Sequence, residues 1–294
     1  MNKSIIFIIG LFAYSFSNWN YADFEIIINN NPFPSNIFLH TQQSNFMAIL
    51  DESLETYWFV KSDNLGGLDF KPSNDYISYF DKSNNQWVIA NKYMNHIDTV
   101  KCTSGITDYH DIRILNNGGY IIQSYDSLFV DMSDIVDGGN QNAKIKGVLR
   151  IQEFNSSHEL ILDWFAFDHL NIQDFTNLNL TNSEFTWMHG NSIEIDYDNN
   201  LFFSDRRSSQ VVKIHRTTGD VIWILGGPLN VFQILNDPFG TFTKQHDARR
   251  LENGNILLFD NGNGHNPPTS RVVEYQIDEQ NMIATLIWEF VNPY

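Results

Sequence analysis

The sequence predicts an all-β protein, and within that class a β-propeller. Short apolar, strand-like runs separated by Asn, Asp and Gly dominate its 294 residues, and apolar residues rarely recur at helical spacing. The same series of strands also returns several times along the chain with related residues. This length suits a single all-β domain, so we expect residues 18–294 to form one propeller domain.

A histidine begins each of three related repeats. One repeat starts at His110-Asp111 and another at His246-Asp247, and in both an Asn-Gly turn follows at the same offset. The third starts at His189, and its Asp-Asn turn comes two residues later, which keeps alternate side chains on the same strand face. Asn-Gly between apolar runs predicts a tight hairpin in which both central residues have positive φ.

Each repeat continues through further strands to one that carries a tryptophan, at Trp164, Trp223 and Trp288. A weaker first copy spans residues 46–89. Four short antiparallel strands per repeat are typical of a propeller blade. A sandwich of hairpins is the alternative, but it does not require its hairpins to resemble one another. About four blades are recognisable with no closing half-blade, so we expect the C-terminal part of the ring to be missing.

The N-terminus resembles an export signal. Lys3 precedes an apolar run from Ile5 to Phe16, which is too short to span a bilayer but fits a secretory signal peptide over residues 1–17. A buried first strand is the alternative. No other run is apolar enough to span a membrane, and we expect a periplasmic or secreted protein. The single cysteine, Cys102, excludes an internal disulfide and is expected to be a small core residue.

The composition narrows the possible partners. A formal net charge of −17 repels nucleic acid and anionic lipid, so neither is expected to bind. A site for a small anion must therefore be locally positive. The Gly-rich segment Asn261-Gly262-Asn263-Gly264 precedes no predicted helix, so it is not a phosphate-binding loop. The oligomeric state is left open.

Because the first strand of a blade lines the channel of a propeller, His110, His189 and His246 are expected to converge at one mouth of that channel. A structural role is the alternative, in which a histidine–aspartate contact repeats from blade to blade. Three histidines could also bind zinc. The remaining histidines share no repeat position, and we interpret them as surface or loop residues: His40, His96, His158, His169, His215 and His265.

Several motifs together resemble the arylsulfotransferase family, from about Phe24 to the C-terminus. They are Met188–Ile193, Ser204–Ser209, Gln245–Asn255, Tyr109-His110-Asp111 and Leu225-Gly226-Gly227. The resemblance implies a six-bladed propeller that transfers a sulfuryl group from a phenolic sulfate ester to another phenol. It implies no nucleotide donor, cofactor or metal.

The resemblance also implies roles for individual residues. His246 matches the nucleophile that is transiently sulfated, and His189 and His110 match the other active-site histidines. Arg207 fits the catalytic arginine, with Arg206 as the alternative one residue away. The list of expected substrate-binding residues is Asn191 and Arg206.

Physical chemistry agrees with these roles. A neutral imidazole is a competent nucleophile near pH 7, and Arg and Asn donors can hold sulfuryl oxygens. Trp187 and Phe239 could stack on a phenol, although core packing is the commoner role of aromatic residues. Two rival functions stay open, a metal site and a non-catalytic propeller that binds a ligand or partner; an arginine in the pocket weighs against the metal.

Overall fold

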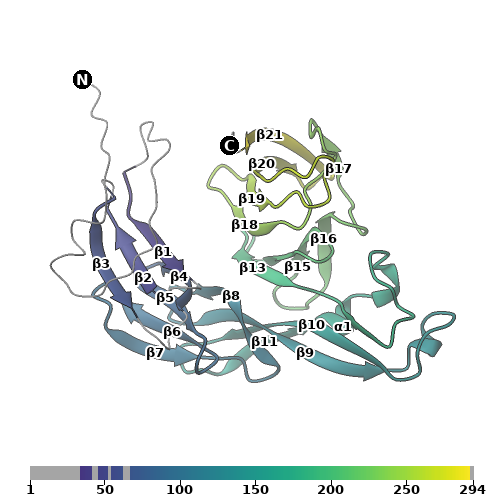
Figure 1. Ribbon diagram of the computed structural model, residues 1–294, viewed down its shortest axis with the longest axis horizontal. Helices are drawn as coiled ribbons and strands as arrows, with labels where there is room; N and C mark the ends of the chain where they lie inside the picture. The colour runs from purple at the N-terminus through teal and green to yellow at the C-terminus, as the bar shows by residue number, and fades with distance from the viewer. Residues whose placement is uncertain (1–33, 42–45, 52–53, 62–66, 292–294) are drawn as a thin grey trace. The chain divides into compact units, whose positions relative to one another are not determined.

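The computed structural model describes residues 34–41, 46–51, 54–61 and 67–291, whose strands form five sheets (Figure 1). In this part of the chain helix is limited to the short turns Met132–Asp134, α1 (Ala166–His169) and Ile172–Asp174. None of these is long enough to cross a membrane. The all-β prediction is confirmed, whereas the predicted signal peptide lies outside the described residues.

The first of two compact units ends at Thr99 and contains two antiparallel sheets. Their strands are β1 (Ile37–Thr41), β2 (Phe46–Leu50) and β3 (Thr56–Lys61) in one sheet, and β4 (Gly67–Ser73), β5 (Tyr76–Asp81), β6 (Gln86–Asn91) and β7 (His96–Val100) in the other.

The sequence predicted a single blade over residues 46–89, whereas the structure divides these residues between two sheets. The sequence analysis missed the strand that begins the second sheet, β4, because Asp69, Lys71 and Pro72 interrupt its apolar pattern. Leu68 and Phe70 are nevertheless buried on alternate positions. Because β4 lies at the sheet edge, its proline costs no ladder hydrogen bond.

The second unit, Val100–Tyr294, contains three sheets. The first holds β8 (Ile106–Ile114), β9 (Tyr120–Val130), β10 (Ala143–Phe154), β11 (Leu160–Phe165) and β12 (Glu184–Thr186). The second holds β13 (Gly190–Ile195), β14 (Leu201–Asp205), β15 (Gln210–Ile214) and β16 (Val221–Gly226). The third holds β17 (Gln233–Leu235), β18 (His246–Arg250), β19 (Ile256–Asp260), β20 (Arg271–Asp278) and β21 (Ile283–Val291).

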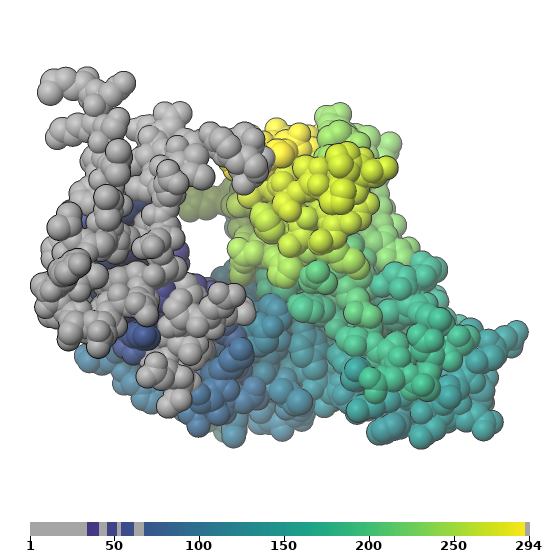
Figure 2. Space-filling model, in the orientation of Figure 1, coloured from purple at the N-terminus to yellow at the C-terminus, as the bar shows by residue number. Residues whose placement is uncertain are grey.

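Apolar side chains pack between successive sheets of this second unit. Trp164 of β11 lies against Phe203 of β14, with ring centroids 5.1 Å apart. Both are fully buried, and burying a phenylalanine of this kind contributes about 1.5–3 kcal/mol. Trp223 belongs to the cluster that joins the second and third sheets, which form one continuous surface in the space-filling view (Figure 2). Trp288, by contrast, is 48% exposed.

The turns after the first strands differ from the expected two-residue hairpins. In the first sheet Leu115 N–H donates to Gly119 O and Gly118 N–H donates to Leu115 O, and the turns at residues 196–200 and 251–255 repeat this pattern. Only one residue per turn has positive φ, for example Gly118 at 82°. The loop is therefore a five-residue turn with one left-handed position, which Gly or Asn occupies readily.

The innermost strand pair of each sheet in the second unit contains a register shift. The shifts fall between Thr107 and Ile112, between Gly190 and Ser192, and between His246 and Arg249. Such bulges re-aim side chains and are frequent beside active sites. Each predicted histidine lies in or directly beside one of them.

Candidate active site

The three repeat histidines meet at one place. β13 lies against both β8 and β18, and His110, His189 and His246 belong to these strands or directly precede them. The ring centroids of His110 and His189 are 4.7 Å apart, those of His189 and His246 6.3 Å, and those of His110 and His246 6.5 Å. The predicted convergence is therefore present in the second unit.

His110 has a carboxylate partner. Its Nδ1 lies 2.8 Å from Asp108 Oδ2, and its backbone N–H donates to the same oxygen. Gln123 Nε2 also donates to this carboxylate and fixes its position. Because an ionised carboxylate only accepts hydrogen bonds, Nδ1 carries a proton. The other ring nitrogen, Nε2, faces His189 Nε2 at 3.2 Å.

His246 has an amide partner instead. Its Nδ1 donates to Asn261 Oδ1 across 2.6 Å, and the backbone carbonyl of Lys244 also accepts a hydrogen bond from this ring. Burial lowers the pKa of His246, and His110 and Arg206 lower it further, against the opposing effect of Asn261. The ring is therefore neutral at pH 7 and carries its lone pair on Nε2.

His189 is the most strongly perturbed of the three. Burial lowers its pKa to about 4, with smaller contributions from His110 and Arg206. Its Nε2 lies 3.2 Å from His110 Nε2, so one of the two nitrogens donates to the other. Its backbone N–H donates to Asp205 Oδ1 across 2.8 Å. His189 is thus a neutral ring held by its backbone and its neighbour.

Cationic residues lie beside the histidines. Arg206 lowers the pKa of His189, His246 and Lys244, whereas Arg207 is a cause only for Lys244. Arg206 is half-buried and Arg207 is exposed. Lys244 Nζ donates to the backbone oxygen of Arg207. The electrostatic effect of Arg206 on two of the histidines and its burial therefore favour this arginine, the alternative named from the sequence, over Arg207.

Asn191 lies next to the site but is engaged in holding the chain. Its Nδ2 donates to Gln245 O across 2.8 Å, and its Oδ1 accepts from Asp247 N at 3.2 Å. These two bonds tie β13 to the segment that carries His246. Its expected contact with substrate would have to use the second N–H of the amide.

The aspartate of the first His-Asp pair links all three sheets of the second unit. Asp111 is fully buried, and its Oδ2 accepts from Ile193 N at 2.7 Å and from Arg249 Nη1 at 2.8 Å. This is not the repeating histidine–aspartate contact considered as an alternative, because Asp111 bonds to Ile193 and Arg249, while its neighbour His110 faces the other histidines.

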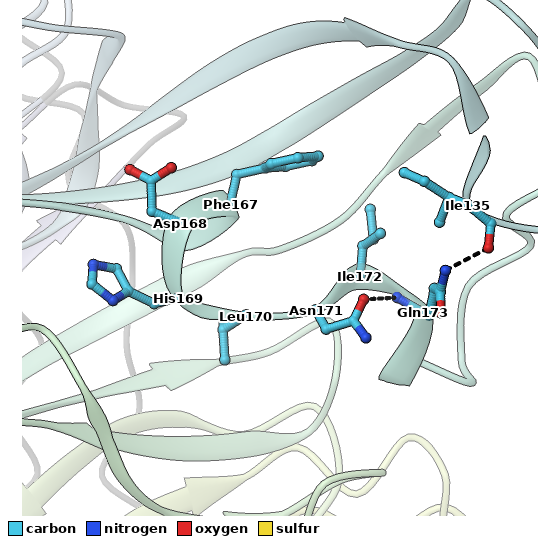
Figure 3. Close-up of a pocket in the computed structure, with 8 residues that line it drawn as sticks. All are labelled: Ile135, Phe167, Asp168, His169, Leu170, Asn171, Ile172 and Gln173. Atoms are coloured by element: carbon cyan, nitrogen blue, oxygen red, sulfur yellow. Dashed lines mark hydrogen bonds between the residues drawn. The ribbon is translucent and has the colours of Figure 1, made fainter. Parts of the chain in front are cut away.

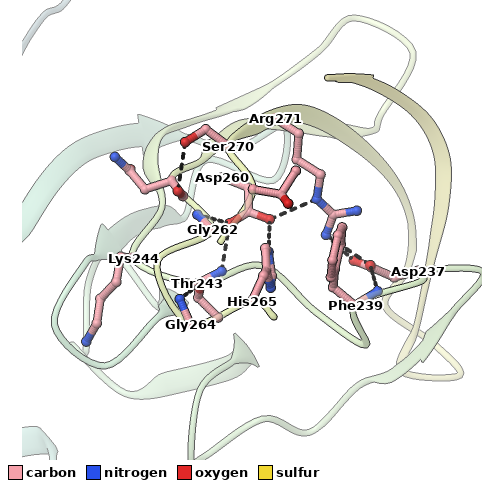
Figure 4. A network of polar contacts seen from close by, with 12 residues as sticks. Asp237, Phe239, Thr243, Lys244, Asp260, Gly262, Gly264, His265, Ser270 and Arg271 are labelled. Atoms are coloured by element: carbon pink, nitrogen blue, oxygen red, sulfur yellow. Dashed lines mark hydrogen bonds and ion pairs between the residues drawn. The ribbon is translucent and has the colours of Figure 1, made fainter. Parts of the chain in front are cut away.

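Two aromatic residues lie elsewhere than suggested. Trp187 is fully buried and packs edge-on against Phe167 and Phe175, so it belongs to the core. Phe239 stacks on His265 with centroids 4.3 Å apart (Figure 4). His265 lies in a loop but is buried, with Nε2 2.7 Å from Asp260 Oδ2. Of the two places expected for it, surface or loop, His265 takes the loop, and the contacts with Asp260 and Phe239 cover its ring.

Two further features of the described residues lie outside the histidine cluster. A cavity of about 400 Å³ is lined by residues 167–173 and Ile135 (Figure 3), and none of the three histidines borders it. Cys102 is buried, and burial raises the pKa of its thiol to about 12, so it is not a thiolate nucleophile. No group of three or more His, Cys, Asp or Glu side chains in this part of the chain could hold a metal ion.

Repeated antiparallel sheets, whose first strands bring three imidazoles together near the arginine that follows β14, define a propeller protein with a cluster of basic side chains. The Arylsulfotransferase (ASST) family matches residues 20–294. The chain belongs to this family, which is a propeller, and its five sheets are blades of that type. No curated protein matches the chain.

Solved structures resemble the chain only distantly. They include a protein of unknown function from Bacteroides caccae (10% identity, TM-score 0.44, covering 88% of this chain and 94% of that one). Another is virginiamycin B lyase from Staphylococcus aureus (12%, 0.46, 89% and 68%). A third is a functionally unknown protein from Desulfotomaculum acetoxidans (7%, 0.49, 87% and 79%). At these scores the likenesses carry no argument.

Sequence reasoning missed Asp108, Asn261 and Lys244. Asp108 precedes the recognised His-Asp pair by two residues and faces His110 through the bulge of β8. Asn261 lies in the Gly-rich segment, which had been weighed only as a phosphate loop. The repeat itself was a usable signal for Asn261, because this residue directly follows β19, the strand that pairs with the one carrying His246.

Proposed function

We propose that the chain is an aryl-sulfate sulfotransferase that works by ping-pong transfer through a sulfated His246. The observation that carries the proposal is the meeting of three imidazoles, whose ring centroids lie 4.7–6.5 Å apart, near an arginine, Arg206, that lowers the pKa of two of them. Family membership supports sulfotransferase activity in general. The cationic neighbours also provide the locally positive site that an acidic protein needs to bind an anionic donor.

In the first half-reaction the Nε2 lone pair of His246 attacks sulfur. An N–S bond forms, the S–O bond to the aryl group breaks, and the phenoxide leaves with the bonding electrons. His110 is the group suited to protonate it, because Asp108 can stabilise an imidazolium before the transfer. Arg206 offsets the negative charge on the sulfuryl oxygens.

In the second half-reaction a phenol enters and its oxygen attacks the same sulfur. The O–S bond forms, the N–S bond breaks, and the electron pair returns to Nε2 of His246. His110, left neutral by the first step, accepts the phenolic proton. Atoms and charge balance over the cycle, so neither a cofactor nor a nucleotide is needed.

The test is a mass measurement on the intact protein after incubation with para-nitrophenyl sulfate and no acceptor. We expect a gain of one sulfuryl group, its absence in His246→Ala, and its release when phenol is added. His215→Ala is the matched control, because that histidine is exposed and contacts only its own turn. Equal labelling of His246→Ala would refute the proposal, and no labelling of the wild type would favour a non-catalytic propeller.

A further inference from the structure

We propose that Asn261 is the positioning residue that fixes the tautomer of His246 and keeps its sulfated form reactive. The proposal rests on the proposed function and assigns a role to a residue outside the set inferred from the sequence. Its basis is the 2.6 Å hydrogen bond between His246 Nδ1 and Asn261 Oδ1. Asn261 acts through His246 and does not contact the transferred group.

The acceptor on Nδ1 of His246 selects one tautomer. The side-chain oxygen of Asn261 can only accept, so the proton resides on Nδ1. The lone pair is then on Nε2, the other nitrogen of the ring. Without this acceptor, part of the population would carry the proton on Nε2 and could not attack sulfur.

The backbone of Asn261 is itself immobilised. Its carbonyl accepts from Ser270 Oγ at 2.9 Å. The next residue, Gly262, has φ of 61°, and a Cβ there would lie 1.7 Å from Thr269 O, so only glycine fits. The backbone conformation of the turn that carries Asn261 is therefore fixed.

Asp260 joins this turn to the segment that leads into His246 (Figure 4). Its Oδ1 accepts from Gly262 N at 2.9 Å and from Thr243 N at 2.8 Å. Its Oδ2 accepts from Arg271 Nε and lies 2.7 Å from His265 Nε2. Because one buried carboxylate holds Thr243 and Gly262 together, the spacing between His246 and Asn261 is fixed from both sides.

An amide differs from a carboxylate in one chemically important way. When Nε2 is sulfated and Nδ1 keeps its proton, the ring carries a positive charge. A carboxylate would neutralise that charge and make the ring a poorer leaving group, whereas the neutral amide orients the ring without doing so. The neutral partner Asn261 thus suits His246, which must lose a sulfuryl group, and the anionic partner Asp108 suits His110, which must give up a proton.

The test compares Asn261→Ala and Asn261→Asp with the control Asn253→Ala. Asn253 lies in the turn at the opposite end of the β18–β19 hairpin and bonds to Glu274. Nitrogen NMR of histidine-labelled protein reports the His246 tautomer, with His246→Ala assigning the signal, and steady-state kinetics are followed across pH.

For Asn261→Ala we expect a mixed tautomer and a kcat lowered about 10–100-fold with KM little changed. For Asn261→Asp we expect the acid limb of the pH profile to move up by about one unit or more, and desulfation by phenol to slow. The control Asn253→Ala should match the wild type in the His246 tautomer, in kcat, in the pH profile and in the rate of desulfation.

The inference is overturned if Asn261→Ala keeps the Nδ1–H form, or if both variants keep the wild-type pH profile. It is equally overturned if Asn253→Ala reproduces their effects. The nitrogen NMR measurement requires no catalytic turnover. It therefore tests the tautomer of His246 even if this residue is never sulfated. Absence of sulfation would reject the proposed function separately.

Discussion

The surroundings of His110 and His246 differ, although the two residues occupy the same position in their repeats. Each donates from Nδ1, His110 to the carboxylate of Asp108 in its own strand and His246 to the amide of Asn261 beyond the neighbouring strand. In the proposed mechanism the carboxylate suits a ring that cycles through a cation, and the amide suits one that must be neutral to attack. Repetition brings the imidazoles together, and their immediate neighbours make them chemically different.

The strongest way to break this comparison is Asp108→Asn, which gives His110 an amide partner like that of His246. The amide oxygen can still accept from Nδ1, so the change removes mainly the charge. We expect kcat to fall about 10²–10³-fold with a poor phenolic leaving group, and much less with para-nitrophenyl sulfate, whose phenoxide needs little protonation.

Leaving-group dependence of kcat across a series of aryl sulfates measures this effect. A uniform loss over the series would contradict the role of His110 as an acid. Asp126→Asn is the control, since that carboxylate pairs with Arg150 within the first sheet.

The second prediction separates the two adjacent arginines. Arg206→Ala should lower kcat/KM about 100-fold, while Arg207→Ala should change it by a few-fold at most, because Arg206 is among the charges that lower the pKa of His189 and His246. Removing the Arg206 cation also raises the pKa of His246, so the acid limb of activity should move to higher pH. Parallel pH–rate profiles test both points, and equal effects of the two changes would contradict them.

The smallest expected effect concerns stability. The folded-state pKa of His189 is about 4 against an ordinary 6.5, so the unfolded chain binds more protons between these values. Stability therefore rises with pH across this window and is lost as pH falls through it. Urea unfolding near pH 7 and near pH 5 should show the loss reduced by about 1 kcal/mol in His189→Asn. An unchanged loss would mean that the ring is not held neutral.

The sequence predicted the parts of this site that follow from repetition. The registers of His110, His189 and His246 were sufficient to bring them together, because equivalent strands occupy equivalent places in successive blades. The sequence analysis did not find the boundary between the first two sheets, because polar residues and Pro72 interrupt the apolar pattern of the edge strand β4.

What the repeat does not encode was missed or left open. The choice between Arg206 and Arg207 depends on the turn after β14, and Trp187 faces the core because the loop aromatics Phe167 and Phe175 pack on it. The contact of Asp108 with His110 depends on the bulge of β8, whose geometry no spacing rule specifies, whereas Asn261 could have been found from its place directly after β19.

The carboxylate of Asp111 has a consequence for how the protein assembles. In a chain of repeats that touch only their neighbours, stability is close to a sum of local and nearest-neighbour contributions. Asp111 extends from β8 past the adjoining blade to Arg249 on β18, so loss of the last blade would remove this cationic partner of a buried anion in the first. These three blades are therefore expected to melt as one cooperative block, with catalytic competence disappearing at the same step.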